Sequence, residues 1–317
     1  MKKILINILL YLVCSQNFSF SQNNVDLTFE DYVKLNDEEQ RLIEYKDKPE
    51  ILKLKIDLLL YINKSRKKFK VQRLMLDILA SRVANKMAIE AASNNFMGHF
   101  NLNGEKPYHR YANVGGKDHI TENAGAISFD TPFNHSFENI KNSMQKLHDA
   151  FMAEKAPNDG HKQTCIHPDH NYIGIGIGYH GKELRYYEEY IDRYLEFGEI
   201  PETVNNGSDV VINVKPIDKD HYLYAVVGYL DPAPKNMKSG KISRLSSYDD
   251  YSKEQFISLP PWEMPEKEST GYYPVKVHFE KPGWYYLQVF LSTKPYKSGK
   301  ASTDGKICSS GIVIKVK

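Results

Sequence analysis

The stretch Tyr172-Ile173-Gly174-Ile175-Gly176-Ile177-Gly178-Tyr179 decides how the first half of the chain folds. Isoleucine alternates with glycine at the period of two that is typical of a β-strand. Because glycine has no side chain, we predict a strand that packs tightly against its neighbours. Residues 185–190 follow closely and predict a second strand of the same sheet.

Helical periodicity precedes this pair of predicted strands. Apolar residues recur at i, i+3 and i+4 from Pro49 to Leu60 and again over 71–87, and Ser136 is placed to cap a third helix that runs to Phe151. The segments 99–133 and 155–170 are rich in loop-forming residues, and we expect loops there. Helices combined with short strands in one unit predict an α-β-α sandwich.

The pattern changes after Pro201. Five segments at 210–214, 222–230, 275–279, 284–291 and 312–316 alternate or are rich in β-branched and aromatic residues, with turn residues between them. This composition predicts an antiparallel β-sandwich of immunoglobulin-like architecture. The chain is therefore expected to be of the α+β class: a 22–49 N-terminal extension, a mixed domain at 50–192, a linker at 193–204 and an all-β domain at 205–317.

The first 21 residues have the features of a secretory signal peptide. Lys2 and Lys3 precede an eleven-residue apolar core, which is too short to span a bilayer, and Ser19 and Ser21 suit cleavage after Ser21. The alternative is a lipid anchor on Cys14, but the bulky Val13 before it disfavours that. We expect a secreted or periplasmic protein with no transmembrane segment.

Charge and cysteine content narrow the possible partners. Of 42 basic residues, Lys2 and Lys3 leave with the signal, so 40 basic face 40 acidic residues in the mature chain. This balance argues against a general nucleic-acid binder. Cys165 and Cys308 remain in a compartment that permits disulfides. We favour two unpaired cysteines over a bridge between them.

Five motifs stand in a fixed order in the first half of the chain. They are Gly98-His99, Gly104-x-x-Pro107-x-x-Arg110, Glu122-Asn123, Gly160-His161 and the Ile-Gly strand, preceded by Asn63-x-x-Arg66. This order resembles the CAP superfamily, which contains cysteine-rich secretory proteins, venom antigens and pathogenesis-related proteins. The resemblance covers about residues 55–192 and implies the α-β-α sandwich of that family.

The resemblance also implies a set of site residues. The family's central cavity holds two histidines and two acids, which correspond here to His99, Glu122 and His161, with Glu154 as the second acid. Glu154 stands three residues after Phe151, which occupies a position where many members have tryptophan. Glu138 is the competing choice for the second acid. The resemblance implies sterol or lipid binding, metal binding or, rarely, proteolysis.

These residue types fit metal chemistry. Two neutral imidazoles can bind Zn²⁺ and leave positions open, while neighbouring carboxylates orient the ligands. We expect a binding module for a divalent metal or a small ligand, contacting an unidentified extracellular partner, rather than an enzyme. The first alternative is a metal-dependent hydrolase of peptides or cell-wall material with Glu122 or Glu154 as base. The second is a purely structural hydrogen-bond network.

Other polar residues receive structural interpretations. We expect His109, His119 and His148 on the surface, and His167 and His170 in a solvated loop. Arg110 is expected to anchor a loop.

Overall fold

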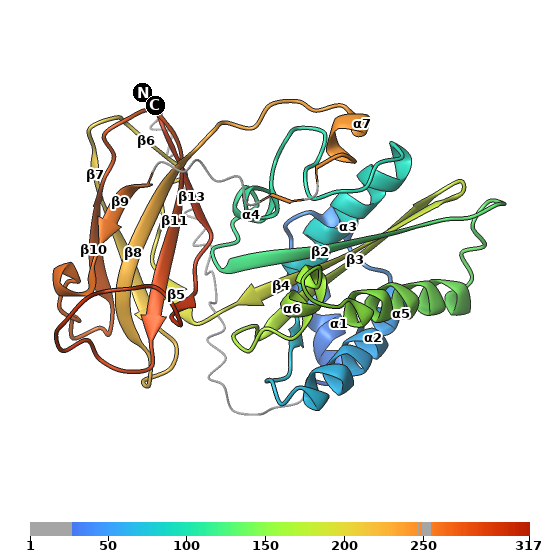
Figure 1. Ribbon diagram of the computed structural model, residues 1–317, viewed down its shortest axis with the longest axis horizontal. Coiled ribbons are helices and arrows are strands. Elements are labelled where there is room, and N and C mark those ends of the chain that lie inside the picture. The colour runs from blue at the N-terminus through green and yellow to red at the C-terminus, as the bar shows by residue number, and fades with distance from the viewer. Residues whose placement is uncertain (1–26, 246, 249–254) are drawn as a thin grey trace, which may run out of the picture.

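The computed structural model describes residues 27–245, 247, 248 and 255–317. The predicted signal peptide at 1–21, including Cys14, lies outside these described residues. The chain combines helices with three sheets, which confirms the α+β class (Figure 1).

The first half is built around a four-stranded sheet with the order β1-β3-β4-β2. Its strands are β1 (Met75–Leu76), β2 (His119–Ser128), β3 (Tyr172–His180) and β4 (Glu183–Asp192). The strands predicted at 172–179 and 185–190 are β3 and β4. Strands β2 and β3 both pair antiparallel with β4, so β2 is an edge strand.

The glycines of β3 allow helix α3 (Ile78–Ser93) to lie directly on the sheet. A Cβ atom added at Gly174, Gly176 or Gly178 would lie 2.2–2.5 Å from backbone atoms of the alanines in α3, namely Ala80, Ala84 and Ala88. Two strand residues rise about 6.6 Å and four helical residues about 6 Å, so the two series stay in step. The predicted tight packing of this strand is confirmed.

The other face of this sheet is covered by two long helices. Helices α2 (Pro49–Lys68) and α5 (Phe137–Ala153) pack around the buried isoleucines of β3. Helix α1 (Phe29–Glu38) and the short helix η1 (Ile43–Tyr45) complete the N-terminal part. Helices thus lie on both faces of the sheet (Figure 1).

Three secondary-structure expectations were wrong in part. Residues 71–77 are not helical: they contain β1, and Asp77 caps α3 by accepting the backbone N–H of Ala80. The segment expected as loop at 99–133 contains α4 (Pro107–Ala112) and β2, and 155–170 contains α6 (Gly160–Cys165). Strand β2 has few large apolar residues, yet Glu122, Asn123, Ala124 and Gly125 at its centre are buried.

The second half consists of two further sheets. One has the order β10-β7-β5, made of β10 (Tyr273–His278), β7 (Asp209–Pro216) and β5 (Leu195–Phe197). The other contains β6 (Thr203–Val204), β8 (Tyr222–Asp231), β9 (Gln255–Leu259), β11 (Gly283–Ser292), β12 (Ile307–Cys308) and β13 (Ile312–Val316). One apolar cluster draws residues from both sheets. Short helices α7 (Ser239–Ile242) and η2 (Pro261–Glu263) lie in the connections on either side of β9.

The two halves share buried contacts. Asp231 at the end of β8 accepts hydrogen bonds from Lys106 Nζ at 2.8 Å and from Tyr108 Oη at 2.6 Å. The ring of Tyr108 stacks on Tyr286 of β11, with 4.1 Å between centroids. The segment 193–204, expected as a linker, contributes β5 and β6 to the sheets of the second half.

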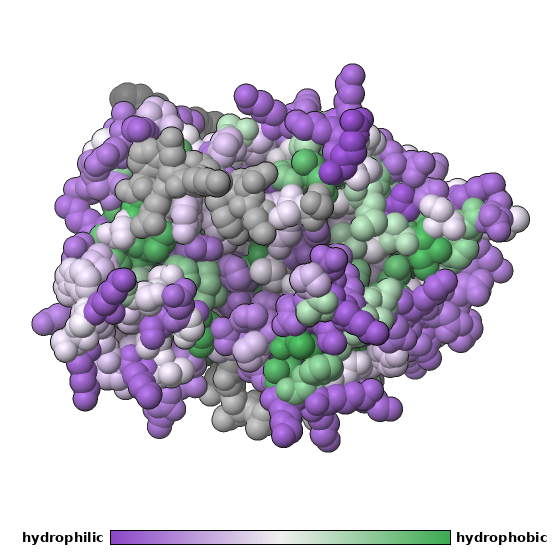
Figure 2. Space-filling view, in the orientation of Figure 1, coloured by the Kyte–Doolittle hydropathy of each residue, from purple (hydrophilic) through white to green (hydrophobic). Residues whose placement is uncertain are grey.

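One face of the molecule is mostly hydrophilic. Figure 2 shows a mostly hydrophilic face on which the apolar patches are separated from one another. Across the described ranges, none of the helices combines the length and the apolar character needed to cross a bilayer.

Candidate functional site

His99 and Glu122 form a pair at the edge of the four-stranded sheet. His99 lies in the loop after α3, and Glu122 lies in β2. The Nδ1 atom of His99 is 2.8 Å from Glu122 Oε1, with 12% of the His99 side chain and none of the Glu122 side chain exposed. A carboxylate bound at Nδ1 fixes the orientation of the imidazole ring.

Glu122 is itself held from two sides. Arg110 forms an ion pair with its Oε2 atom and lies 3.5 Å from Glu189 Oε1. Glu189 is directly opposite Glu122 in the register of β2 and β4. Burial raises the pKa of Glu122 despite Arg110, and burial together with the Glu122 charge holds the pKa of Glu189 well above its usual range. Both directions have the same physical origin, which is that two carboxyls are buried opposite each other on paired strands.

Arg110 also fixes the backbone of the loop that carries His99. Its guanidinium donates to the carbonyl of His99 at 2.6 Å and to that of Glu105 at 3.3 Å. The expectation that Arg110 anchors a loop is confirmed. Its position in α4 lets one side chain fix both the backbone of His99 and the carboxylate that orients the His99 ring.

A segment of the second half lies over His99. Tyr248, in the connection between β8 and β9, accepts the backbone N–H of Glu122 at 3.0 Å, and its ring centroid is 4.8 Å from that of His99. Earlier in the same connection, Ile242 is fully buried, and a Cβ atom added at Gly98 would lie 3.0 Å from it. Gly98 is therefore required where this connection crosses the loop before His99.

His161 and Glu154 form a second pair of the same kind. Glu154 follows the last residue of α5, and His161 is the second residue of α6. Glu154 accepts the backbone N–H of His161 at 3.0 Å through Oε2, and its Oε1 atom is 2.5 Å from Nδ1. About a third of the His161 side chain is exposed. Glu138 lies in the first turn of α5, roughly 24 Å of helix away, so Glu154 is the acid that pairs with His161.

The two pairs flank neighbouring residues of β2. Glu122 faces α3, on the same face as Ala124. Asn123 faces the opposite side, where its Nδ2 atom donates to the carbonyl of His161 at 3.0 Å. Since successive strand residues point to opposite faces, the pairs approach β2 from different sides, and they can meet only around its free edge.

A third cluster, missed by sequence reasoning, is buried beneath α5. His148, Cys165 and Glu188 bring possible ligand atoms within 4.8 Å of one another. Both oxygens of Glu188 already have donors: His148 and Tyr186 at Oε1, Tyr190 and Cys165 at Oε2. Burial, together with Glu188, holds the pKa of the Cys165 thiol well above its usual range. With donors at both Glu188 oxygens, the side chains form a closed hydrogen-bond network in this structure.

Two of the histidines expected on the surface are buried. His148 is fully buried, and His109 is 1% exposed with its Nε2 atom 2.8 Å from Asp231. His170, expected in a solvated loop, is also buried, with its Nδ1 atom 2.5 Å from Asp192. Each has a carboxylate partner far away in sequence, which no local pattern reveals.

Glu189 and Tyr248 are the site residues that sequence reasoning missed. Glu189 carried a usable signal, because two adjacent acids in an otherwise aromatic strand must bury at least one carboxylate. Tyr248 carried none, since its connection has no periodicity. Cys165 and Cys308 are both free thiols, as favoured from the sequence.

Comparison with known proteins gives little more. No protein-family model matches the chain, and no curated protein matches it. Among solved structures it is similar to an outer surface protein from Borrelia burgdorferi, at 19% identity and a TM-score of 0.34, over 44% of this chain and 93% of that one. A likeness at that TM-score leaves function to be argued from the residues themselves.

Proposed function

We propose that the chain is a secreted binding module of the CAP type, in which His99 and His161 hold a divalent metal ion such as Zn²⁺. One observation carries the proposal: each imidazole has its Nδ1 atom against a carboxylate, Glu122 at 2.8 Å and Glu154 at 2.5 Å. Carboxylate–histidine pairs of this kind accompany zinc ligands, because they fix the tautomer that leaves Nε2 as the ligating atom.

The donor set fits zinc. Two neutral imidazole nitrogens leave two tetrahedral positions for water or a ligand, and a bound Zn²⁺ would supply a Lewis-acid centre there. Sharing one ion requires the two Nε2 atoms to lie about 3–4 Å apart, given Zn–N distances of about 2.0–2.1 Å. Because the two pairs approach β2 from different sides, the proposal requires both rings to reach one ion at the free edge of this strand, next to Glu122 and Asn123.

Binding is favoured over hydrolysis. A general base needs an oxygen that can take a proton from water. Glu122 uses its two oxygens for His99 and Arg110, and Glu154 uses its two for the ring and backbone of His161. The buried Cys165, with its raised pKa, is unsuited as a nucleophile.

The second half suits a contact role in this scheme. We propose that it is an immunoglobulin-like sandwich following a CAP domain, and that it meets an extracellular partner. Its sheets share buried contacts with the first half through Asp231 and Tyr286, so a partner bound there would hold the candidate site in a fixed orientation.

Zinc titration calorimetry tests the metal proposal. The native protein should bind one Zn²⁺, and His99→Ala and His161→Ala should each abolish saturable binding. Affinity should fall as pH drops through the histidine range, because ligation needs neutral imidazole. His278→Ala is the matched control, since His278 also pairs with a carboxylate, Asp209 at 2.8 Å, but lies on the surface of the second half.

Two results would overturn the proposal. Equal zinc binding by the native protein and both site variants would place the metal elsewhere. No zinc binding by the native protein would leave the two pairs as a structural network. A Co²⁺-substituted sample adds a geometric check, because tetrahedral coordination by two imidazoles gives intense visible absorption that the two variants should lack.

A further inference from the structure

A pocket of about 160 Å³ lies beside the candidate site, between η1, α3, the turn at 101–105 and the end of α4. We propose that it binds a small aliphatic zwitterion, with the size and chemistry of a branched-chain amino acid. The proposal does not depend on the metal site, because its charged contacts, Lys86 and Glu90, are not residues of that site.

The size of the pocket limits what can enter. Cavities of about 150 Å³ in protein cores admit a single benzene ring, so this one has room for a short branched chain and its polar end. Four of its lining side chains are apolar: Leu42, Val83, Met87 and Val114. Lys86 and Asn113 are exposed, so the pocket is open to solvent at one side.

Charges of both signs stand at that opening. Lys86 and Glu90 are one turn apart on α3 and both line the pocket. Such i, i+4 neighbours commonly form a salt bridge. Within the described residues, however, no ion pair joins these two side chains. Glu90 instead uses Oε1 to accept the backbone N–H of Leu102 at 2.7 Å, which directs it across the pocket toward the 101–105 turn.

This arrangement matches a ligand with adjacent opposite charges. A carboxylate would bind the Lys86 ammonium, and an ammonium group would bind the remaining oxygen of Glu90. The other acid, Glu105, is already occupied by the side-chain amides of Asn101 at 2.6 Å and Asn113 at 2.8 Å. Glu90 is therefore the acid left to receive a cation.

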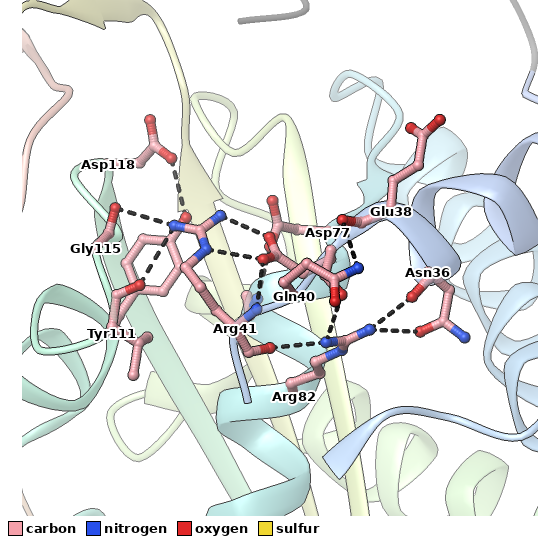
Figure 3. Close-up of polar contacts among 12 residues, drawn as sticks. Asn36, Glu38, Gln40, Arg41, Asp77, Arg82, Tyr111, Gly115 and Asp118 are labelled. Atoms are coloured by element: carbon pink, nitrogen blue, oxygen red, sulfur yellow. Dashed lines mark hydrogen bonds and ion pairs between the residues drawn. The ribbon is translucent and has the colours of Figure 1, made fainter. Parts of the chain in front are cut away.

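The apolar wall opposite α3 is held in an unusual backbone conformation. Leu42 has φ 52° and ψ 44°, the left-handed region that a leucine rarely adopts. Arg82 secures this segment by donating to the carbonyls of Asn36 and Arg41 at 2.6 and 2.7 Å, and Arg41 reaches the carbonyl of Gly115 at 3.3 Å (Figure 3). Strained residues that the surroundings hold this firmly tend to occur at ligand sites.

The pocket touches the candidate site through one side chain. Arg110 lines the pocket and also holds Glu122 and the carbonyl of His99. A ligand seated in the pocket would pack against the same side chain that orients the His99 pair. Occupancy of the pocket can therefore stabilise the loop around His99.

Calorimetric titration of the full chain with L-leucine tests the proposal. We expect saturable binding, lost when either charge of the ligand is missing, as in 4-methylpentanoate or 3-methylbutylamine. Lys86→Met and Glu90→Gln should each weaken leucine binding by roughly tenfold. Lys64→Met, an exposed lysine of α2, is the matched control and should leave binding unchanged.

The size requirement gives a second test on the same native protein. L-Tryptophan should bind at least about tenfold more weakly than leucine, because its ring system exceeds the pocket. Absence of saturable leucine binding by the native protein would overturn the proposal. Equal binding of leucine by the native protein, Lys86→Met and Glu90→Gln would also overturn it.

Discussion

Tyr248 and Glu122 are 126 positions apart in the chain, yet the backbone N–H of Glu122 donates to the Tyr248 hydroxyl at 3.0 Å. The same phenol ring packs against His99, with 4.8 Å between centroids. His99 is already oriented by Glu122 at its Nδ1 atom and by Arg110 at its carbonyl. The Tyr248 ring therefore shields the His99 imidazole from solvent, while other groups set the orientation of that imidazole.

Removing this cover should make His99 more reactive. We expect Tyr248→Ala to raise the rate of diethylpyrocarbonate modification of His99 several-fold, because the ring that shields it is gone. Tyr248→Phe should change the rate little, since the ring stays and only the hydroxyl is lost. Peptide mapping of modified histidines measures this directly, with the exposed His180 as internal reference. An unchanged rate in Tyr248→Ala would show that other groups shield His99.

Gly176 offers a test of the packing between β3 and α3. A Cβ atom there would lie 2.2 Å from the backbone carbon of Ala84, so the helix itself would have to move. We expect Gly176→Ala to lower the free energy of unfolding by roughly 1–3 kcal/mol, as overpacking does. Urea denaturation measures the loss. Gly160→Ala is the control, because nothing lies within 4 Å of its Cβ position. Equal stability of the two variants would mean that α3 adjusts freely.

The parts of the fold with strong local patterns were predictable. The Ile-Gly alternation located β3, and Ser136 accepts the backbone N–H of Asn139 at the start of α5, as its capping role requires. Strand β2 was not predictable, because few of its residues are large and apolar. Strand β1, a two-residue strand paired in parallel with β3, was not predictable either.

Some residues of the candidate site and of the other polar clusters were predictable from the sequence, and others were not. His99 and His161 were singled out by the order of short motifs in the sequence, and each has a carboxylate partner in the structure. The partners of His109, His148 and His170 lie 122, 40 and 22 positions away, and only tertiary structure brings them together. A histidine expected at the surface can thus be buried whenever a distant carboxylate compensates its polarity.

His148 and Glu188 should contribute stability in a defined pH range. Burial opposes the charge on His148, but Glu188 at 2.8 Å outweighs it and raises the pKa of His148 above its usual 6.5. Burial raises the pKa of Glu188. Contacts with His148, Tyr186 and Tyr190 outweigh burial, so this pKa lies below its usual 4.5. The contribution of His148 is therefore complete below about pH 6.5 and is lost as pH rises through the raised pKa. That of Glu188 is present above about pH 4.5 and is lost as pH falls below it.

The variant His148→Gln tests this. It should lower the free energy of unfolding by about 3–5 kcal/mol near pH 5.5, since one partner of a buried charged pair is gone. The difference from the native protein should be smaller near pH 9, because the charge on His148 is lost as pH rises through its raised pKa. Urea denaturation at the two pH values gives both differences. A difference that does not depend on pH would show that His148 is neutral in the folded protein.

Asp231 should hold the two halves of the chain together. Burial raises the pKa of its carboxyl, but contacts with His109, Lys106 and Tyr108 outweigh burial and lower it, so the group is charged at neutral pH. Asp231→Asn would remove the charged end of a buried ion pair, in which Asp231 lies 2.8 Å from Lys106 Nζ. We expect a loss of about 3–5 kcal/mol in the free energy of unfolding. Lys106→Met combined with Asp231→Leu should recover only part of it, because the buried Tyr108 hydroxyl and His109 ring would still lose Asp231 as their acceptor.

The unfolding of each half can be followed by its own spectroscopic signal. Fluorescence follows Trp262 and Trp284, both in the second half, and the ring centroid of Trp284 lies 5.4 Å from that of His109. Far-ultraviolet circular dichroism follows the helices of the first half. In the native protein both signals should change in one urea transition, because Tyr108, Tyr286 and Asp231 couple the halves. In Asp231→Asn the transitions should separate. Asp209→Asn, an exposed aspartate paired with Lys276 at 2.7 Å, should change neither signal. If Asp231→Asn unfolds at the same urea concentration as Asp209→Asn, the halves are held together by their apolar contacts instead.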